Sequence, residues 1–395
     1  MPDPDRIAAR LEDLWQIAHG PGGGADRPAF SPAEAQAMRL VAGWARQAGL
    51  EPGLDRHGNL WGLPSGSDGP LVTSGSHVDT VPDGGRYDGA LGTVLGLELA
   101  HELPGCGVLV CAAEEAPRFG AGTIGSRLLV GSLPQSALAE LSDADGITAA
   151  AARERYLDHL GDLPAVQRPP VGRLRAHLEV HVAQRRALRE LGVVTTVASP
   201  RRLQVTFSGQ SGHAGEVSMP ERHDALAAAA EFVLAVERAA GEEPPETVAT
   251  VGTIAVAPGA VSVIPGRARL GLDIRGISPP SLRRLDEAIR EQAAALAARR
   301  GVGIDLRVVR DGEPVALDRG LADAALQSAR RLGIPAEETW SGAGHDAQHL
   351  AALTATLLLF VPLHGGESHT PQEGAEMAEI IQAAELGAAV LAARA

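Results

Sequence analysis

The chain contains no lysine, so all 35 basic residues among its 395 are arginine. This absence excludes a phosphate-binding Walker lysine, a Schiff-base lysine and a serine–lysine catalytic dyad. Basic runs are absent too, the net charge is −14, and aromatic residues make up only 3% of the chain. Nucleic acid is therefore not expected as a partner, because its recognition uses basic patches and stacking aromatics.

Cysteine and long hydrophobic runs are scarce as well. Cys106 and Cys111 lie five residues apart on one predicted strand and hence on opposite faces, which favours packed thiols over a metal pair or a disulfide and fits a reducing compartment. The longest apolar stretch, AALTATLLLFVP, is too short for a bilayer and predicts a buried strand. The opening MPDPDRIAARLEDLWQIAHG has the charges of an amphipathic helix rather than a signal peptide. We expect a cytoplasmic protein without a membrane partner.

The length of the chain and its changing pattern predict two domains. Residues 1–60 read as helical, with Ser31 as the N-cap of a second helix and Glu34 at the capping-box position. Apolar strands and helices then alternate, as in an α/β sheet with helices on both faces. Residues 199–311 instead follow the order β-α-β-β-α-β of a two-layer α+β domain. We therefore expect an α/β domain, residues 1–198 and 312–395, interrupted by an inserted α+β domain, 199–311.

Histidines and acids gather where strands are predicted to end. One strand ends at His77, with Asp79 two residues later and Asp88 after a glycine-rich loop. A carboxylate that holds the second ring nitrogen of a histidine is the arrangement that metal ligands need. CAAEEAPRFG places Glu114 and Glu115 after the next strand, either as two solvated loop acids or as two groups with different tasks.

Two further strand ends carry histidines. RAHLEVHVAQ contains His177 and His181; His181, nearer the strand end, is the better ligand candidate, and His177 is expected to be a packed or exposed histidine. HGGESHTPQE places His369 after the last apolar strand. Sites of open α/β sheets form at the carboxyl ends of strands, so these groups should converge. A set without cysteine suits zinc or another divalent first-row metal, and two ions more naturally than one.

Two other enzyme classes have weaker support. FGAGTIGSR contains a G-x-G-x-x-G pattern, formed by Gly120, Gly122 and Gly125. A dinucleotide there would have its pyrophosphate next to Glu114 and Glu115, and no acid ends a strand about twenty residues later. A serine hydrolase is disfavoured because the chain has no G-x-S-x-G motif.

Taken together, these residues resemble the hydantoinase/carbamoylase amidase branch of the M20 metallopeptidase superfamily. That branch includes N-carbamoyl-L-amino-acid hydrolases, β-ureidopropionases of the yeast and bacterial type, and allantoate amidohydrolases. The strings that carry the resemblance span residues 31–373 and include SGSHVDTVPDGGRYDG, EEAPRFG, HLEVHVAQ, GHAGEVSMPERHDAL, SVIPGRARLGLDIR, SGAGHDA and GGESHTPQE. The resemblance implies an α/β/α metallopeptidase-type catalytic domain with an inserted lid domain that also forms a homodimer.

The same resemblance implies two divalent metal ions per subunit, most naturally zinc, with manganese, cobalt or nickel as alternatives. His77 and His181 would bind one ion. Glu115 and His369 would bind the other, and Asp88 would bridge the two.

The resemblance also assigns catalytic roles to three residues. Asp79 would orient a ligand histidine, and Glu114 would be the general base. His213 of the GHAG string would stabilise the tetrahedral oxyanion, either within one chain or across a dimer interface. The activity implied is hydrolysis of a linear amide or ureido bond in a small anionic substrate.

Several residues match substrate-contact positions of the family. Arg275 would bind the substrate's carboxylate through its planar fork, although a purely structural role is the alternative. The remaining candidates are Gln184, Ser262, Gly342 and Ala343, whereas the neighbouring pair His345 and Asp346 is expected to brace the helix that follows.

The chain departs from the family pattern at positions linked to substrate recognition. Ala183 and Arg185 replace an acid and a glycine, Ser262 stands for an asparagine, and Pro117 follows a changed E-E-A string. Membership of the family would therefore not identify the substrate of this protein. An M20 aminoacylase or dipeptidase is the enzymatic alternative, disfavoured because those relatives typically carry an acid at the position of His181. A non-catalytic small-molecule-binding homologue is the alternative from another class.

Overall fold

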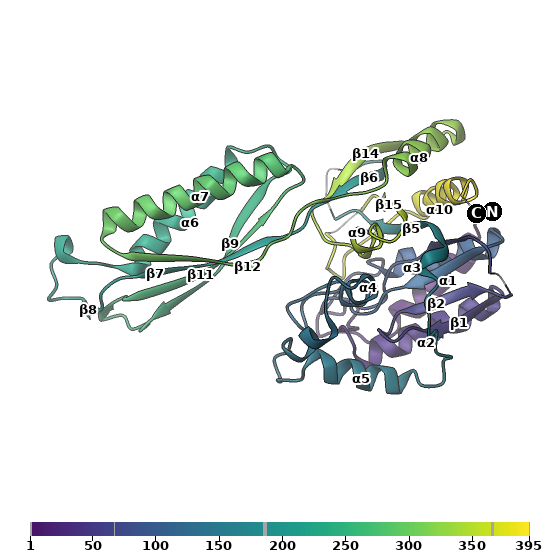
Figure 1. Cartoon of the computed structure of the whole chain (residues 1–395), viewed down its shortest axis with the longest axis horizontal. Coiled ribbons are helices and arrows are strands. Elements are labelled where there is room, and N and C mark those ends of the chain that lie inside the picture. Colours follow the sequence, from purple (N-terminus) through teal and green to yellow (C-terminus); the bar gives the residue numbers. More distant parts are fainter. Residues whose placement is uncertain (1, 67, 185–187, 365–366, 395) are drawn as a thin grey trace. The chain divides into compact units, whose positions relative to one another are not determined.

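The computed structural model describes residues 2–66, 68–184, 188–364 and 367–394 (Figure 1). The chain divides into two compact units, Met1–Thr195 with Ala316–Ala395, and Thr196–Val315. Each unit has its own hydrophobic core. The insert expected from the sequence, 199–311, falls inside the second unit. In the described part of the chain, every helix is too short or too polar to cross a membrane.

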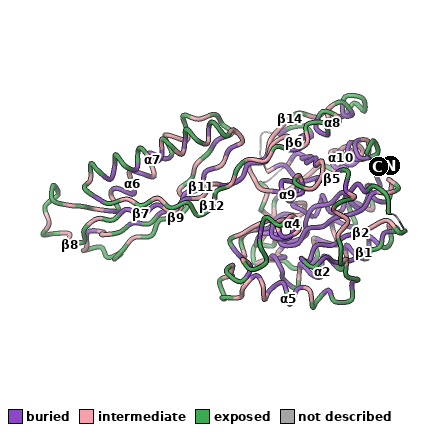
Figure 2. Tube along the Cα trace, viewed as in Figure 1, coloured by how far each residue is buried: buried purple, intermediate pink, exposed green. Residues whose placement is uncertain are grey.

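A nine-stranded sheet forms the centre of the first unit, with the strand order β1-β2-β4-β3-β5-β15-β6-β13 and with β14 paired to β6. The parallel central strands are β4 (Cys106–Val110), β3 (Leu71–Ser74), β5 (Leu174–Val182) and β15 (Ala355–Val361). The outer strands are β1 (Leu50–Leu54), β2 (Leu60–Pro64), β6 (Leu191–Val197), β13 (Val315–Ala316) and β14 (Ala336–Ser341). The central strands are buried almost throughout, as expected for parallel strands covered on both faces (Figure 2).

The helices of this unit are α1 (Pro4–Trp15), α2 (Pro32–Gln47), α3 (Ala90–Glu102), α4 (Ile124–Val130), α5 (Ala149–His159), α8 (Arg319–Leu332), α9 (Asp346–Leu350) and α10 (Met377–Leu391). Side chains alternate across β4: Cys106 lies in the large core, whereas Cys111, just after the strand, packs with Leu350 of α9. Both cysteines are buried and free, so the prediction of packed thiols on opposite faces is confirmed.

The prediction that residues 1–60 consist of two helices joined by a glycine-rich loop is wrong at its end. After α2 the chain forms the antiparallel pair β1 and β2. Pro52 and Gly53 disfavour a helix there. Asp55 fixes the connection between the strands, because its carboxylate accepts hydrogen bonds from the backbone N–H groups of His57 and Asn59.

The second unit has the predicted β-α-β-β-α-β order: β7 (Arg201–Ser208), α6 (Ala225–Gly241), β9 (Val248–Ala257), β11 (Arg267–Arg275), α7 (Pro279–Arg300) and β12 (Gly303–Arg310). Its strands form an antiparallel sheet in the order β12-β7-β11-β9, and α6 and α7 lie together along one face of it (Figure 1). The pair β8 (Gly212–His213) and β10 (Val263–Ile264) forms a separate two-stranded ribbon.

Candidate active site

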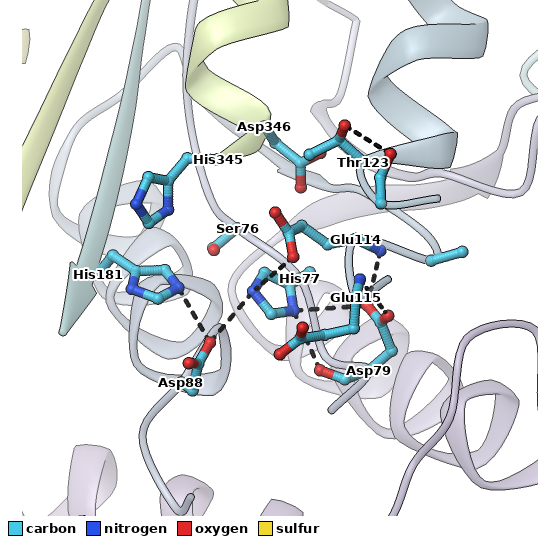
Figure 3. A network of polar contacts seen from close by, with 12 residues as sticks. Ser76, His77, Asp79, Asp88, Glu114, Glu115, Thr123, His181, His345 and Asp346 are labelled. Atoms are coloured by element: carbon cyan, nitrogen blue, oxygen red, sulfur yellow. Dashed lines mark hydrogen bonds and ion pairs between the residues drawn. The ribbon is translucent and has the colours of Figure 1, made fainter. Parts of the chain in front are cut away.

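The candidate ligands meet at one edge of the first unit's sheet. His77 follows β3, Glu114 and Glu115 follow β4, His181 lies near the end of β5, and His369 follows β15. These four strands run parallel, so their carboxyl ends share one edge, where open α/β sheets bind ligands. Figure 3 shows side chains from three of these strand ends turned toward Asp88 and Glu114.

Two groups of side chains in the described residues have the spacing of metal ligands, and they share Asp88. His77, Asp88 and His181 form the first, and Asp88, Glu115 and His369 form the second; the ligand atoms of each group lie within 4.8 Å of one another. Asp88 Oδ1 lies 3.5 Å from His77 Nε2 and 3.1 Å from His181 Nε2.

The second group has similar distances. His369 Nε2 lies 3.2 Å from Asp88 Oδ2 and 3.5 Å from Glu115 Oε1. Two ligands about 2.1 Å from one tetrahedral ion lie about 3.4 Å apart, so both groups fit a divalent cation. The shared carboxylate, with one oxygen toward each group, makes the whole compatible with a dinuclear metal site.

Backbone carbonyls fix the orientation of two of the histidines. His77 Nδ1 lies 3.0 Å from the main-chain oxygen of Asp79, and His181 Nδ1 lies 3.0 Å from that of Val182. A carbonyl only accepts, so each Nδ1 carries a proton. The nitrogen that faces Asp88 is therefore Nε2 in both rings, and its lone pair is the one that a metal ion would take. The Asp79 carboxylate is farther from His77, at 3.4 Å, and its two oxygens accept the N–H groups of Glu114 and Glu115.

The pKa shifts of these residues also support a metal site. Burial raises the pKa of Asp88, but His181, His369 and His77 outweigh it and bring that pKa well below its usual value. The hydrogen bond with Asp88 raises the pKa of His369 to about 9, and burial followed by the charge of Asp88 raises that of Glu115 to about 7. Protons thus gather where a divalent cation would supply positive charge, and metal binding releases such protons.

Glu114 belongs to neither ligand group of the described residues. Its Oε2 lies 4.0 Å from His77 Nε2 and its side chain is 11% exposed. Burial raises the pKa of Glu114 well above its usual value, His77 opposes the shift, and Glu115 adds to it. A carboxylate with a raised pKa beside a candidate metal site is suited to accept and return a proton.

Other predicted residues of the first unit lie close to this centre. Gln184 Nε2 donates to Asp88 Oδ2 at 3.3 Å. Gly342 and Ala343 lie between β14 and His345, whose ring packs against that of His181 with centroids 4.6 Å apart. His345 stands at the N-cap of α9 without capping it through its side chain, and instead its Nε2 lies 2.9 Å from Ser341 Oγ.

The remaining predicted residues lie elsewhere. His177 is buried next to Thr73, with Nδ1 3.0 Å from the hydroxyl, and joins neither ligand group, as expected for a packed histidine. Arg185 lies outside the described residues.

His213, Ser262 and Arg275 belong to the second unit, and they do not lie together within it. His213 pairs with Val263, and Ala214 donates to Ser262, so both are at the Arg267 end of β11. Arg275 ends the same nine-residue strand, which spans about 27 Å. One small substrate cannot touch His213 and Arg275 of the same chain unless this unit rearranges.

The sequence interpretation gave no role to two buried acids, Glu179 and Glu373. Glu373 Oε2 accepts the N–H groups of Tyr87 and Asp88 at 2.7 and 3.0 Å, which fixes the loop that carries Asp88. Glu179 accepts from Ser76 Oγ and from the N–H of Ala347. The available signals were the position of Glu373 four residues after His369 and that of Glu179 two residues before His181.

Two glycines of the G-x-G-x-x-G pattern, Gly122 and Gly125, have a packing role. A Cβ at Gly125 would come within 2.2 Å of Asn59 Oδ1 and 2.5 Å of the oxygen of Ala112, and a Cβ at Gly122 within 2.7 Å of the oxygen of Glu114. Glycine therefore lets this loop approach the turn that carries the glutamate pair.

A cavity of about 450 Å³ adjoins the ligand set, since Glu115 contributes to its wall. Much of its remaining lining is apolar and includes Pro28, Pro82, Pro117 and Ile147. The guanidinium of Arg118, also in the wall, is bound to Asp143 and to a backbone carbonyl. The cavity therefore has room for an uncharged group of a small molecule.

Known proteins are similar to this chain in sequence and in fold. An N-carbamoyl-L-amino acid amidohydrolase from Geobacillus stearothermophilus is 35% identical over 383 residues, which cover 93% of each chain. An allantoate amidohydrolase from Bacillus subtilis is 32% identical over 382 residues, covering 93% of this chain and 92% of the relative. A hydantoinase/carbamoylase family amidase from Burkholderia multivorans superposes with a TM-score of 0.87 at 33% identity, covering 100% of this chain and 98% of that one. The resemblance drawn from the motifs is thus confirmed, and with residues 74–393 matching its family model, the chain belongs to peptidase family M20/M25/M40.

Proposed function

We propose that the protein is a dinuclear metal-dependent amidohydrolase that cleaves a linear carbamoyl, ureido or amide C–N bond of a small anionic substrate. The observation that carries this proposal is the pair of ligand groups that share Asp88. Glu114 lies beside them and, among the described residues, belongs to neither group. The names of the two relatives, one acting on N-carbamoyl-L-amino acids and one on allantoate, support this bond type. Zinc is the proposed metal, and the cytoplasm is the proposed location.

His77 and His181 would hold one ion, and Glu115 and His369 would hold the other. Asp88 would be a ligand of both ions. Bound divalent ions would lower the pKa of water toward about 7 and polarise the substrate's carbonyl. Glu114 accepts a proton from the attacking water and returns it to the leaving nitrogen. Asp79 holds the backbone of Glu114 and keeps the His77 side chain in place.

Recognition of the substrate is assigned to both units. Arg275 binds the carboxylate, Gln184 and the backbone of Gly342 and Ala343 contact the polar part, and the cavity beside Glu115 accepts an uncharged substituent. His213 and Ser262 complete the site from the second subunit of a homodimer. The separation of His213 from Arg275 along β11 supports the assignment of these two residues to different chains.

Release of ammonia or of the free amine across a substrate panel tests the proposed function. The panel contains N-carbamoyl-L-amino acids with small and branched side chains, 3-ureidopropionate, allantoate and N-acetyl amino acids, each with zinc, manganese or cobalt. We expect turnover of at least one carbamoyl or ureido substrate. Turnover of N-acyl amino acids or dipeptides alone would instead assign an aminoacylase or peptidase, and no turnover with well under one ion per subunit would indicate a binding protein.

Complementation tests the assignment of His213 to the opposite subunit. His213→Ala and Glu114→Gln should each be nearly inactive. Dissociated and remixed in equal amounts, they should recover about a quarter of the wild-type activity, because half of the dimers then have one site without either substitution. No recovery despite verified exchange of subunits would assign His213 to its own chain's site.

A further inference from the structure

The backbone that carries the glutamate pair is held by side chains from three other segments. Four successive N–H groups, at residues 112–115, donate to side-chain oxygens. The acceptors are Asn59 Oδ1 for Ala112 (3.0 Å), Glu34 Oε1 for Ala113 (2.8 Å), and Asp79 Oδ1 and Oδ2 for Glu114 (3.1 Å) and Glu115 (2.9 Å). Beyond β4 the strand ladder has ended, so these side chains supply the acceptors that a neighbouring strand would otherwise provide.

The opposite edge of the same segment is also fixed. The carbonyl oxygens of residues 112–114 accept hydrogen bonds from the N–H groups of Gly125, Ile124 and Thr123, in that order. Donors and acceptors on both edges are therefore paired, which leaves the segment little freedom. Glu114 and Glu115 can then point to different partners although they are adjacent in sequence.

Glu34 is an unexpected member of this arrangement. It is fully buried at the start of α2, where Ser31 Oγ caps the helix by accepting the N–H of Glu34. The capping-box prediction assigns its carboxylate to the N–H of Ser31, but the carboxylate instead accepts from Phe30 and Ala113. The two residues whose N–H groups donate to this carboxylate, Phe30 and Ala113, both have left-handed backbone conformations, with φ of 53° and 54°. Non-glycine residues adopt that conformation only where the surroundings impose it.

Asn59 is itself fixed by its neighbours. It is fully buried, and its Nδ2 donates to Asp55 Oδ2 at 2.9 Å and to the oxygen of Gly125 at 3.2 Å. Its Oδ1 is therefore turned toward Ala112 and cannot exchange places with the amide nitrogen without losing all three hydrogen bonds.

We propose that Glu34 and Asn59 are positioning residues for Glu114, which they hold through the backbone of Ala112 and Ala113. The role in catalysis rests on the proposed function, whereas the role in fixing the backbone does not. Among the described residues, no hydrogen bond or ion pair joins Glu34 or Asn59 to a candidate metal ligand. Their hydrogen bonds act on the reaction through the backbone that carries Glu114. Displacement of a reacting group by about 1 Å can cost about 10²-fold in rate.

Glu34→Gln tests the proposal because the glutamine keeps the shape and one acceptor but turns an NH₂ group toward the other backbone N–H. We expect kcat to fall by about 10- to 100-fold, with KM and metal content within about twofold of wild type. Hydrogen exchange of the amides at 112–115 should accelerate while the core strands stay protected. Glu34→Asp, which retains the charge but withdraws the carboxylate, is the second variant if the first does not fold.

Glu98→Gln is the matched control, since Glu98 is likewise a fully buried helical glutamate of the first unit but is bonded to Arg6 and Arg10. Glu98→Gln should change the stability of the protein. It should leave kcat and the hydrogen exchange of the amides at 112–115 as they are in the wild type. In a Glu114→Gln background, Glu34→Gln should lower the remaining rate by less than about twofold, because its effect passes through Glu114.

Three results would overturn the proposal: unchanged kcat with unchanged exchange, an equal loss of kcat in the Glu98 control, or an undiminished effect of Glu34→Gln without Glu114. Failure of the proposed function has a different signature. The wild type would then hydrolyse no member of the panel, while Glu34→Gln would still accelerate exchange at 112–115.

Discussion

Replacing Glu114 with glutamine lowers kcat by about 10³-fold or more and leaves about two metal ions per subunit, if Glu114 moves the proton. Glutamine keeps the size and the hydrogen-bonding shape of the side chain, but it cannot accept a proton at neutral pH. Because Glu114 belongs to neither ligand group of the described residues, its loss should not release metal. Steady-state kinetics and elemental analysis on the same preparation measure both quantities.

Glu115→Gln separates the two neighbours. Glu115 Oε1 lies 3.5 Å from His369 Nε2 within the second ligand group, so this variant should lose metal as well as activity. The pair of variants thus distinguishes a proton carrier from a ligand at adjacent positions. An active Glu114→Gln enzyme, or one that loses metal as Glu115→Gln does, would remove Glu114 from the role of general base.

The sequence predicts the architecture well where its periodicity is strong. The amphipathic helix of the opening segment is found as α1, with Ile7, Leu11 and Leu14 buried along one face, and the order of elements in the insert is found as well. The hairpin of β1 and β2 was missed because LEPGL is short and contains proline and glycine, which indicate where a helix ends but not which element comes next. Tertiary pairing, with β2 against β4, decides that segment.

The candidate site could be predicted at the level of strand ends but not at that of supporting contacts. His77, His181 and His369 each follow or end a parallel strand, and parallel strands share an edge. The contacts of Glu34 with Ala113 and of Glu373 with Asp88 join residues 79 and 285 apart in the sequence. No local pattern encodes such pairs, so they became visible only in the folded chain.

Metal analysis of ligand variants has the second large expected effect. The wild type should hold about two divalent ions per subunit, and His369→Ala should retain about one, because His77, His181 and Asp88 remain to bind the other. Asp88→Ala should retain well below one ion, since Asp88 belongs to both groups. Activity should fall by at least about 10²-fold in both variants, as even the loss of a group that supports a metal ligand costs about 10–100-fold.

The difference in metal content between His369→Ala and Asp88→Ala is the decisive result, because a general loss of structure would lower the metal content of both variants alike. Thermal unfolding with and without a chelator provides the control: a ligand present at about 1,000 times its Kd stabilises the native state by about 4 kcal/mol. The wild type should therefore lose more stability on chelation than His369→Ala, and Asp88→Ala should lose almost none. Two ions retained by Asp88→Ala would mean that this carboxylate does not bridge the groups, and a dinuclear centre would then need other ligands.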